Sequence, residues 1–169
     1  MKKVLQFSGV ISAALALVAI ILLLATPAIR FTGVFSEGTI AGTVALFGEK
    51  SEVLGKAVTV YKPSVLALIG WILALVGFLV VTCGVVLPLL KVKKIEKFAG
   101  VMNLVAVVTL VLAGVFAFLV VPTFASANGA NSTNGLSIGA GWVIAGILSI
   151  AAGAFAILPA AADFLAKKK

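Results

Sequence analysis

Few residues of this chain could carry chemistry. It has no histidine, five acidic residues and one cysteine, Cys83. Glu49 and Glu52 are spaced closely enough to meet on one helical turn, although a solvated loop explains them better. A Cys–His pair or a histidine-containing metal cluster cannot form, and no glycine-rich phosphate loop follows a strand. The residue types therefore predict no catalytic residue, no metal site and no cofactor, and we expect the chain not to be an enzyme.

Three residues inside apolar segments invite a specific role. Asn103 is the strongly polar one, and an amide there is expected to form a hydrogen bond between helices, with pore lining as the alternative. Trp142 lies near one end of the last apolar segment, where an indole suits the interfacial region between water and lipid. Cys83 is interpreted as a small apolar core residue, with palmitoylation as the alternative.

Small residues recur at helical spacing in two apolar segments. The predicted helix-packing residues are Gly141, Ala145, Ser149 and Gly153 in one segment, and Gly70, Gly77 and Gly84 in the other. Residues spaced by four or by seven positions share one face of a helix. In lipid, helices associate by close van der Waals contact, which small side chains permit. We therefore expect these faces to pack against neighbouring helices.

The elements that hold these residues are four long apolar segments in a chain that is 63% hydrophobic and 11% charged. Each exceeds the roughly 20 residues that an α-helix needs to cross a membrane. We predict a single membrane domain, residues 1–169, with helices at about 4–26, 64–90, 98–121 and 139–165. The connections are outer loop 1 at about 27–63, an inner link at 91–97 and outer loop 2 at about 122–138.

The basic residues predict the orientation of these helices. Two precede the first helix, four lie in the 91–97 link and three end the chain, which is nine of the 13. The positive-inside rule then places both termini and the link in the cytoplasm. We expect a multi-pass protein of the plasma membrane. The net charge of +8 is thus a topology signal that contacts lipid headgroups, and no nucleic acid is expected. A signal peptide ending near Ala28 is the alternative for the first helix.

Outer loop 1 is too long to be only a connector. Three of its pieces, Ile29–Phe35, Thr39–Phe47 and Ala57–Tyr61, are rich in β-branched and aromatic residues and predict strands. The segments SEG and GEKSE between them are interpreted as turns, and a helix in SEVLGKAV is the alternative. In outer loop 2, residues 125–135 have a flexible composition, and GLSIG is a further candidate strand.

The last two helices carry motifs that resemble a known family. Gly141-Trp142 stands in NGLSIGAGWVIAGILSIAAGAFA, and the preceding helix has Ala99-Gly100 followed by Ala113-Gly114. In these motifs and in its order of parts the chain resembles the claudin and peripheral myelin protein superfamily. The resemblance implies four helices, cytoplasmic termini and a β-rich first outer loop. Loop 1 lacks the tryptophans and paired cysteines of that family, so no binding residue is carried over. The start MKK and the cysteine-free loops favour a bacterial protein of this shape.

The sequence thus predicts an all-α integral membrane four-helix bundle with a small extracellular antiparallel β-sheet. Its expected function is a non-enzymatic structural or interaction role, through the extracellular loops and lateral helix packing. The expected partners are membrane lipids and either a second copy of the chain or another membrane protein. A channel-forming oligomer and an accessory subunit of a larger membrane complex are the alternatives.

Overall fold

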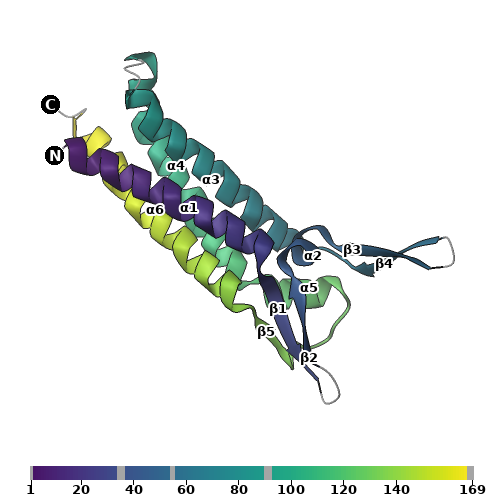
Figure 1. The fold of residues 1–169 in the computed structure, drawn as a ribbon. Helices are drawn as coiled ribbons and strands as arrows, with labels where there is room; N and C mark the ends of the chain where they lie inside the picture. Colours follow the sequence, from purple (N-terminus) through teal and green to yellow (C-terminus); the bar gives the residue numbers. More distant parts are fainter. Residues whose placement is uncertain (1, 34–36, 54–55, 90–92, 167–169) are drawn as a thin grey trace.

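A computed structural model describes residues 2–33, 37–53, 56–89 and 93–166 (Figure 1). Its four long helices are α1 (Lys2–Ala25), α3 (Val65–Leu89), α4 (Lys93–Phe118) and α6 (Ala140–Ala166). Each contains a stretch of 19 to 22 residues that is long and apolar enough to cross a membrane. The predicted four long apolar helices are confirmed. Of the predicted basic clusters, Lys91 and the three C-terminal lysines lie outside the described residues.

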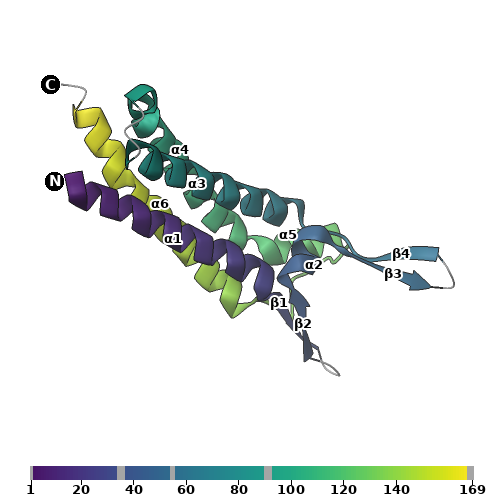
Figure 2. The same ribbon diagram turned by 45° about the horizontal axis from the view of Figure 1, so that its top comes forward.

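The four helices form a bundle in which α4 packs between α3 and α6, and α1 packs mainly on α6. The contact between α1 and α3 is the least extensive of the four neighbouring pairs. Both chain ends lie at one end of this bundle, and the strands lie at the other, which we call the sheet end (Figures 1 and 2). The first and last helices are therefore direct neighbours, although they are separated by most of the sequence.

A three-stranded antiparallel sheet covers part of the sheet end. Its central strand is β1 (Pro27–Thr32), which lies between β2 (Glu37–Ala41) and β5 (Leu136–Ile138). Ile29 of β1 is fully buried and Ile40 of β2 is nearly so, since the alternation of the strands turns both toward the bundle. The β5 strand confirms the candidate strand in GLSIG, and it ties the two loops together.

The predicted strand Thr39–Phe47 is wrong in its second half, because β2 ends at Ala41 and helix α2 (Gly42–Phe47) follows. Gly42, Ala45 and Leu46 are its buried residues, the i, i+3, i+4 pattern of a helical face. The Gly42 amide donates to the Thr26 carbonyl at 3.0 Å, so the chain returns directly onto the end of α1. Propensity for strand is overruled here by a tertiary contact.

A second sheet consists of two antiparallel strands, β3 (Glu49–Val53) and β4 (Lys56–Tyr61), which we call the ribbon. It extends away from the bundle in both ribbon views (Figures 1 and 2). Strand β4 confirms the predicted strand Ala57–Tyr61. The interpretation of GEKSE as a turn is wrong, because most of it belongs to β3. The alternative helix in SEVLGKAV is also wrong for its described residues, which belong to β3 and β4; residues 54 and 55 lie outside the described residues. The structure has two small sheets where the sequence predicted one.

The end of the third long helix also differs from the prediction. Helix α4 ends at Phe118, and after a break at Leu119 the chain forms the short helix α5 (Val120–Ala127) where the sequence predicted loop from residue 122. Proline is tolerated in the first turn of a helix, which accommodates Pro122. Val120, Val121, Phe124 and Ala125 form the buried face of α5. The helix thus covers the sheet end of the bundle.

Candidate interaction surface

The three glycines of α3 lie on one face of the helix, against α4. A Cβ atom at Gly70 would lie 2.8 Å from the Cβ of Phe116, and one at Gly77 would lie 2.6 Å from the Cγ of Leu110. A Cβ at Gly84 would lie 2.6 Å from the Oδ1 of Asn103. All three contacts are with α4. The glycines therefore allow α3 and α4 to approach closely along their length.

The small residues of α6 pack against more than one neighbour. Gly141 lies against Thr26, just beyond α1, whereas a Cβ at Gly153 would lie 2.8 Å from Val111 of α4. Ala145 and Ser149 are buried between them. Residues spaced by four advance about 40° beyond a full turn. The row of Gly141, Ala145, Ser149 and Gly153, which we call the α6 ladder, therefore winds from one neighbour to the next. Its surface is used inside the bundle.

One close approach of α4 and α6 involves Gly146, a glycine that the sequence did not single out. A Cβ at Gly114 would lie 2.7 Å from the carbonyl oxygen of Gly146, and a Cβ at Gly146 would lie 3.3 Å from that of Gly114. The two backbones meet at this crossing. Gly146 follows Ala145 of the ladder directly, and only the pairing with Gly114 reveals its role.

Asn103 is buried, at 2% exposure, on the face of α4 that meets α3. The interhelical hydrogen bond predicted for its side-chain amide is not found at Oδ1, because this buried atom has no donor in the part of the chain that the structure describes. Ser12 forms such a bond instead, and its hydroxyl donates to the carbonyl oxygen of Ala152 at 2.7 Å. This bond joins α1 to α6.

Trp142 does not face an interface between water and lipid, contrary to the prediction. Its side chain is 1% exposed and belongs to the core that includes Ile29 of β1 and Val120 of α5. The strands and α5 cover this end of α6, so the indole is enclosed by protein. Cys83 is exposed on α3, so its interpretation as a core residue is also wrong.

The ribbon is anchored to α5 at its base. The ring of Tyr61 lies 5.8 Å from the ring of Phe124, measured between centroids. The side chain of Asn128, just after α5, accepts from the Lys62 amide at 2.8 Å and donates to the Lys62 carbonyl at 3.1 Å. One side-chain amide thus satisfies both backbone groups of the residue that follows β4.

A second set of contacts fixes the start of α3 beneath the ribbon. The Ser64 hydroxyl lies 2.7 Å from that of Thr123, and the Ser64 amide donates to the Ala45 carbonyl at 2.8 Å. The Ser64 hydroxyl also accepts from the Ala67 amide at 3.3 Å, which caps the helix. Phe47 meets Trp71 edge to face, with centroids 5.7 Å apart. The base of the ribbon is therefore packed and hydrogen-bonded on several sides.

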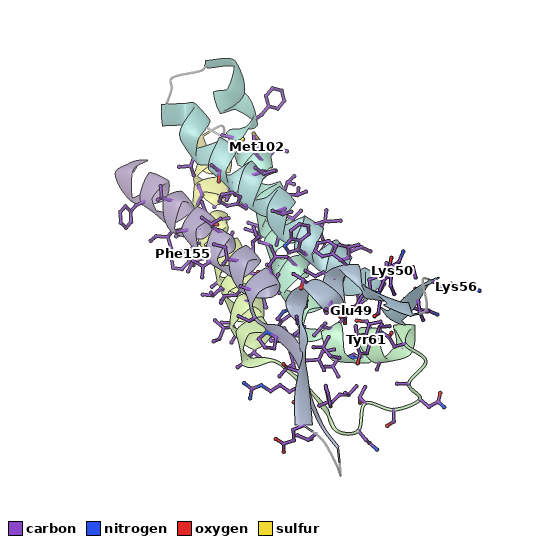
Figure 3. The ribbon with its side chains drawn as sticks, turned by 45° about the vertical axis from the view of Figure 1, so that its right-hand side comes forward. Glu49, Lys50, Lys56, Tyr61, Met102 and Phe155 are labelled. Atoms are coloured by element: carbon purple, nitrogen blue, oxygen red, sulfur yellow. The ribbon has the colours of Figure 1, made fainter. Side chains whose placement is uncertain are left out.

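Beyond this base the ribbon is exposed on both faces. The described side chains of residues 49–52 and 56–60 are all exposed, and Val58 and Val60 are each 48% exposed. In the register, Lys50 pairs with Thr59 and Glu52 with Ala57. Figure 3 labels three charged residues of the ribbon, Glu49, Lys50 and Lys56. The described residues contain no group of three His, Cys, Asp or Glu side chains that could hold a metal ion.

No family model, curated protein or solved structure matches this chain. The role of the ribbon is therefore inferred from its own geometry. It has a firm base on α5, and beyond this base the described side chains of both strands are exposed. The ribbon is therefore the candidate interaction surface.

Proposed function

We propose that the protein is a non-enzymatic multi-pass protein of the plasma membrane that assembles with other protein molecules through the ribbon. The observation that supports this most is the exposure of both ribbon faces on a firmly held base. A two-stranded hairpin alone is marginally stable in water at best. Its free edges carry unpaired backbone groups that a further strand can satisfy.

The charge pattern supports an extracellular ribbon. The basic residues that the structure describes outside the outer loops lie at the starts of α1 and α4, at the end of the bundle opposite the ribbon (Figure 1). The positive-inside rule assigns that end to the cytoplasm. The resemblance to the claudin superfamily adds the arrangement of parts, and the partner is inferred from the ribbon alone.

The small-residue faces favour assembly through the ribbon over assembly through the helices. Gly70, Gly77, Gly84, Gly114 and Gly153 all meet other helices of the same molecule. The outward surfaces of the helices instead carry large apolar side chains, including Phe7, Leu79, Leu104 and Ile147, which suit lipid. These glycines are therefore not free to pack closely against another membrane protein.

The channel alternative receives less support. Among the described residues, the buried polar ones are Ser8, Ser12, Ser64, Asn103 and Ser149. Ser12 already donates across the bundle, and Ser64 caps α3. A pore between several copies needs no buried charge. The channel alternative is therefore tested by measuring the conductance of the purified protein in planar bilayers. Robust, selective single-channel currents would replace the interaction role by the channel.

The proposed function is tested by removing the ribbon. Replacing residues 50–59 with a flexible glycine–serine linker should abolish assembly, while the thermal stability of the bundle in detergent stays the same. A matched replacement of residues 129–133, an exposed part of the loop after α5, should leave assembly intact. Native mass spectrometry after mild detergent extraction reports the assemblies. Unchanged assembly without the ribbon would refute the proposal.

A further inference from the structure

We propose that the partner of the ribbon is a second copy of this chain, bound along the free edge of β3. The two ribbons would then form one four-stranded antiparallel sheet, with a two-fold axis at Ser51. This inference rests on the proposed function and names the partner. It is carried by the backbone geometry of β3 and by the order of its charges.

The backbone of β3 restricts the registers in which two copies can pair. Strand β3 bonds to β4 on one side only, and the two-stranded sheet leaves the other side open. In an antiparallel ladder, the backbone groups of alternate residues point to the same side. Two copies of β3 can form hydrogen bonds only if residues whose backbone groups point to the free edge lie opposite each other. This requires the two-fold axis to pass through a residue and not between two residues. The described central choices are Lys50, Ser51 and Glu52.

The charges select one of these registers. With the axis at Ser51, Lys50 of each copy faces Glu52 of the other, so two opposite-charge pairs form. With the axis at Lys50, two ammonium groups face each other, and with the axis at Glu52, two carboxylates do. Opposite charges placed directly across antiparallel strands stabilise the pair, and like charges destabilise it. The order Lys-Ser-Glu over residues 50–52 is thus self-complementary about its serine.

The opposite edge of the ribbon lacks this property. Lys56 is the charged residue of β4, and Lys62 follows the strand. Two copies joined along β4 would bring together positive charges with no carboxylate on that strand to oppose them. A charged edge normally protects a strand against association, and β4 fits that description. Strand β3 carries both signs in an order that a second copy can match.

The placement of the ribbon leaves room for this sheet. The ribbon projects away from the four helices and from the three-stranded sheet (Figures 1 and 2). In an antiparallel union, the tip of each ribbon points toward the base of the other. The two bundles then stand at opposite ends of the shared sheet, and the helices do not obstruct the pairing. A four-stranded sheet also exceeds the two strands that are marginal as a lone hairpin.

Disulfide cross-linking tests the register. In a Cys83→Ser background, Ser51→Cys places two thiols directly opposite, at a Cβ separation of about 4.5–5.5 Å. Mild oxidation in detergent should convert most of this variant to a covalent dimer. Lys50→Cys and Glu52→Cys should each cross-link several-fold less alone, but efficiently when mixed with each other. Ser132→Cys, in an exposed loop, measures random collision.

Charge reversal tests the pairing independently of any cysteine. Lys50→Glu or Glu52→Lys alone places like charges opposite each other and should raise the dimer dissociation constant on the order of tenfold or more. The double variant restores both pairs with exchanged signs and should regain the wild-type constant. Sedimentation equilibrium in detergent gives the constants. The positions are exposed, and an unchanged melting temperature confirms that each variant is folded.

The outcomes separate this inference from the proposed function. Dimers that cross-link at Ser51 and recover in the double variant support it. A monomeric wild type, or a dimer indifferent to both charge reversals and to Ser51→Cys, overturns it. The proposed function survives that result if removal of the ribbon still abolishes an assembly with a different protein. It fails with the inference if ribbon removal changes no assembly at all.

Discussion

At the scale of single residues, glycine is placed where two helices come into backbone contact. At the crossing of Gly114 and Gly146, the carbonyl oxygen of each residue lies 2.7–3.3 Å from the point where a Cβ of the other would be. Such contacts replace the hydrophobic effect, which does not drive association between helices that already lie in lipid. A spacing of small residues in the sequence predicts that a face packs. It does not identify the neighbour, which explains why Gly146 was missed and why the α6 ladder divides between two partners.

Gly153→Leu is expected to destabilise the bundle by about 1–3 kcal/mol, because overpacking forces neighbouring atoms to move. A Cβ there would already lie 2.8 Å from Val111. The adjacent Ala154 is exposed on the same helix, so Ala154→Leu is the matched control and should cost little. Thermal unfolding in detergent compares the two. Equal melting temperatures would show that the α4–α6 contact is not tight.

Ser12→Ala removes the hydrogen bond to Ala152 that joins the first and last helices. Hydrogen bonds between membrane helices contribute about 0.6 kcal/mol on average and up to ~1.7 kcal/mol. We expect a loss within that range, measured as the free energy of unfolding in detergent. Ser126→Ala, on the exposed side of α5, should have no such effect. A Ser12 variant as stable as its control would exclude a net contribution from this bond.

At the scale of elements, length and composition were enough for the four helices, and β-branched residues were enough for β1, β4 and β5. The errors lie where a tertiary contact decides. Helix α2 forms because Gly42 can lie against the end of α1, and residues 45 and 46 then face the core. Strand β3 has no apolar alternation to reveal it, since it is exposed on both faces. Its candidate role was missed for the same reason.

Gly48 is expected to be essential for the ribbon and dispensable for the bundle. Its φ of +76° turns the chain from α2 into β3, and a Cβ there would lie 2.7 Å from the carbonyl oxygen of Tyr61. Gly48→Ala should therefore loosen the ribbon, with a cost on the order of 1–3 kcal/mol. Limited proteolysis should cut residues 49–61 faster, while the melting temperature of the helices changes little.

Gly129→Ala is the matched control for this substitution. Gly129 has nearly the same φ, +75°, but nothing lies within 4 Å of a Cβ built there. It therefore isolates the backbone strain from the steric contact. Equal protease sensitivity of the ribbon in the two variants would contradict the role assigned to Gly48.

At the scale of the whole molecule, the orientation in the membrane is the prediction with the widest consequences. Single cysteines are introduced into a Cys83→Ser background. Those at Lys94 and Lys168 should be shielded from an impermeant thiol reagent in intact cells, and one at Ser132 should react. The nine-to-four division of basic residues is the reason. Reaction at both lysine positions with protection at Ser132 would reverse the assignment and place the ribbon inside the cell.

The contact between α1 and α6 has a consequence for how the molecule is made. Helix α1 is synthesised before α3, α4 and α6, yet its main neighbour and the acceptor for Ser12 both belong to α6. Strand β1 likewise waits for β5, which directly precedes α6. The α3–α4 hairpin can pack as soon as it is synthesised, whereas α1 can pack on α3 alone until α6 is made. Until then, the surface of α1 that packs on α6, Ser12 included, is left without its final neighbour.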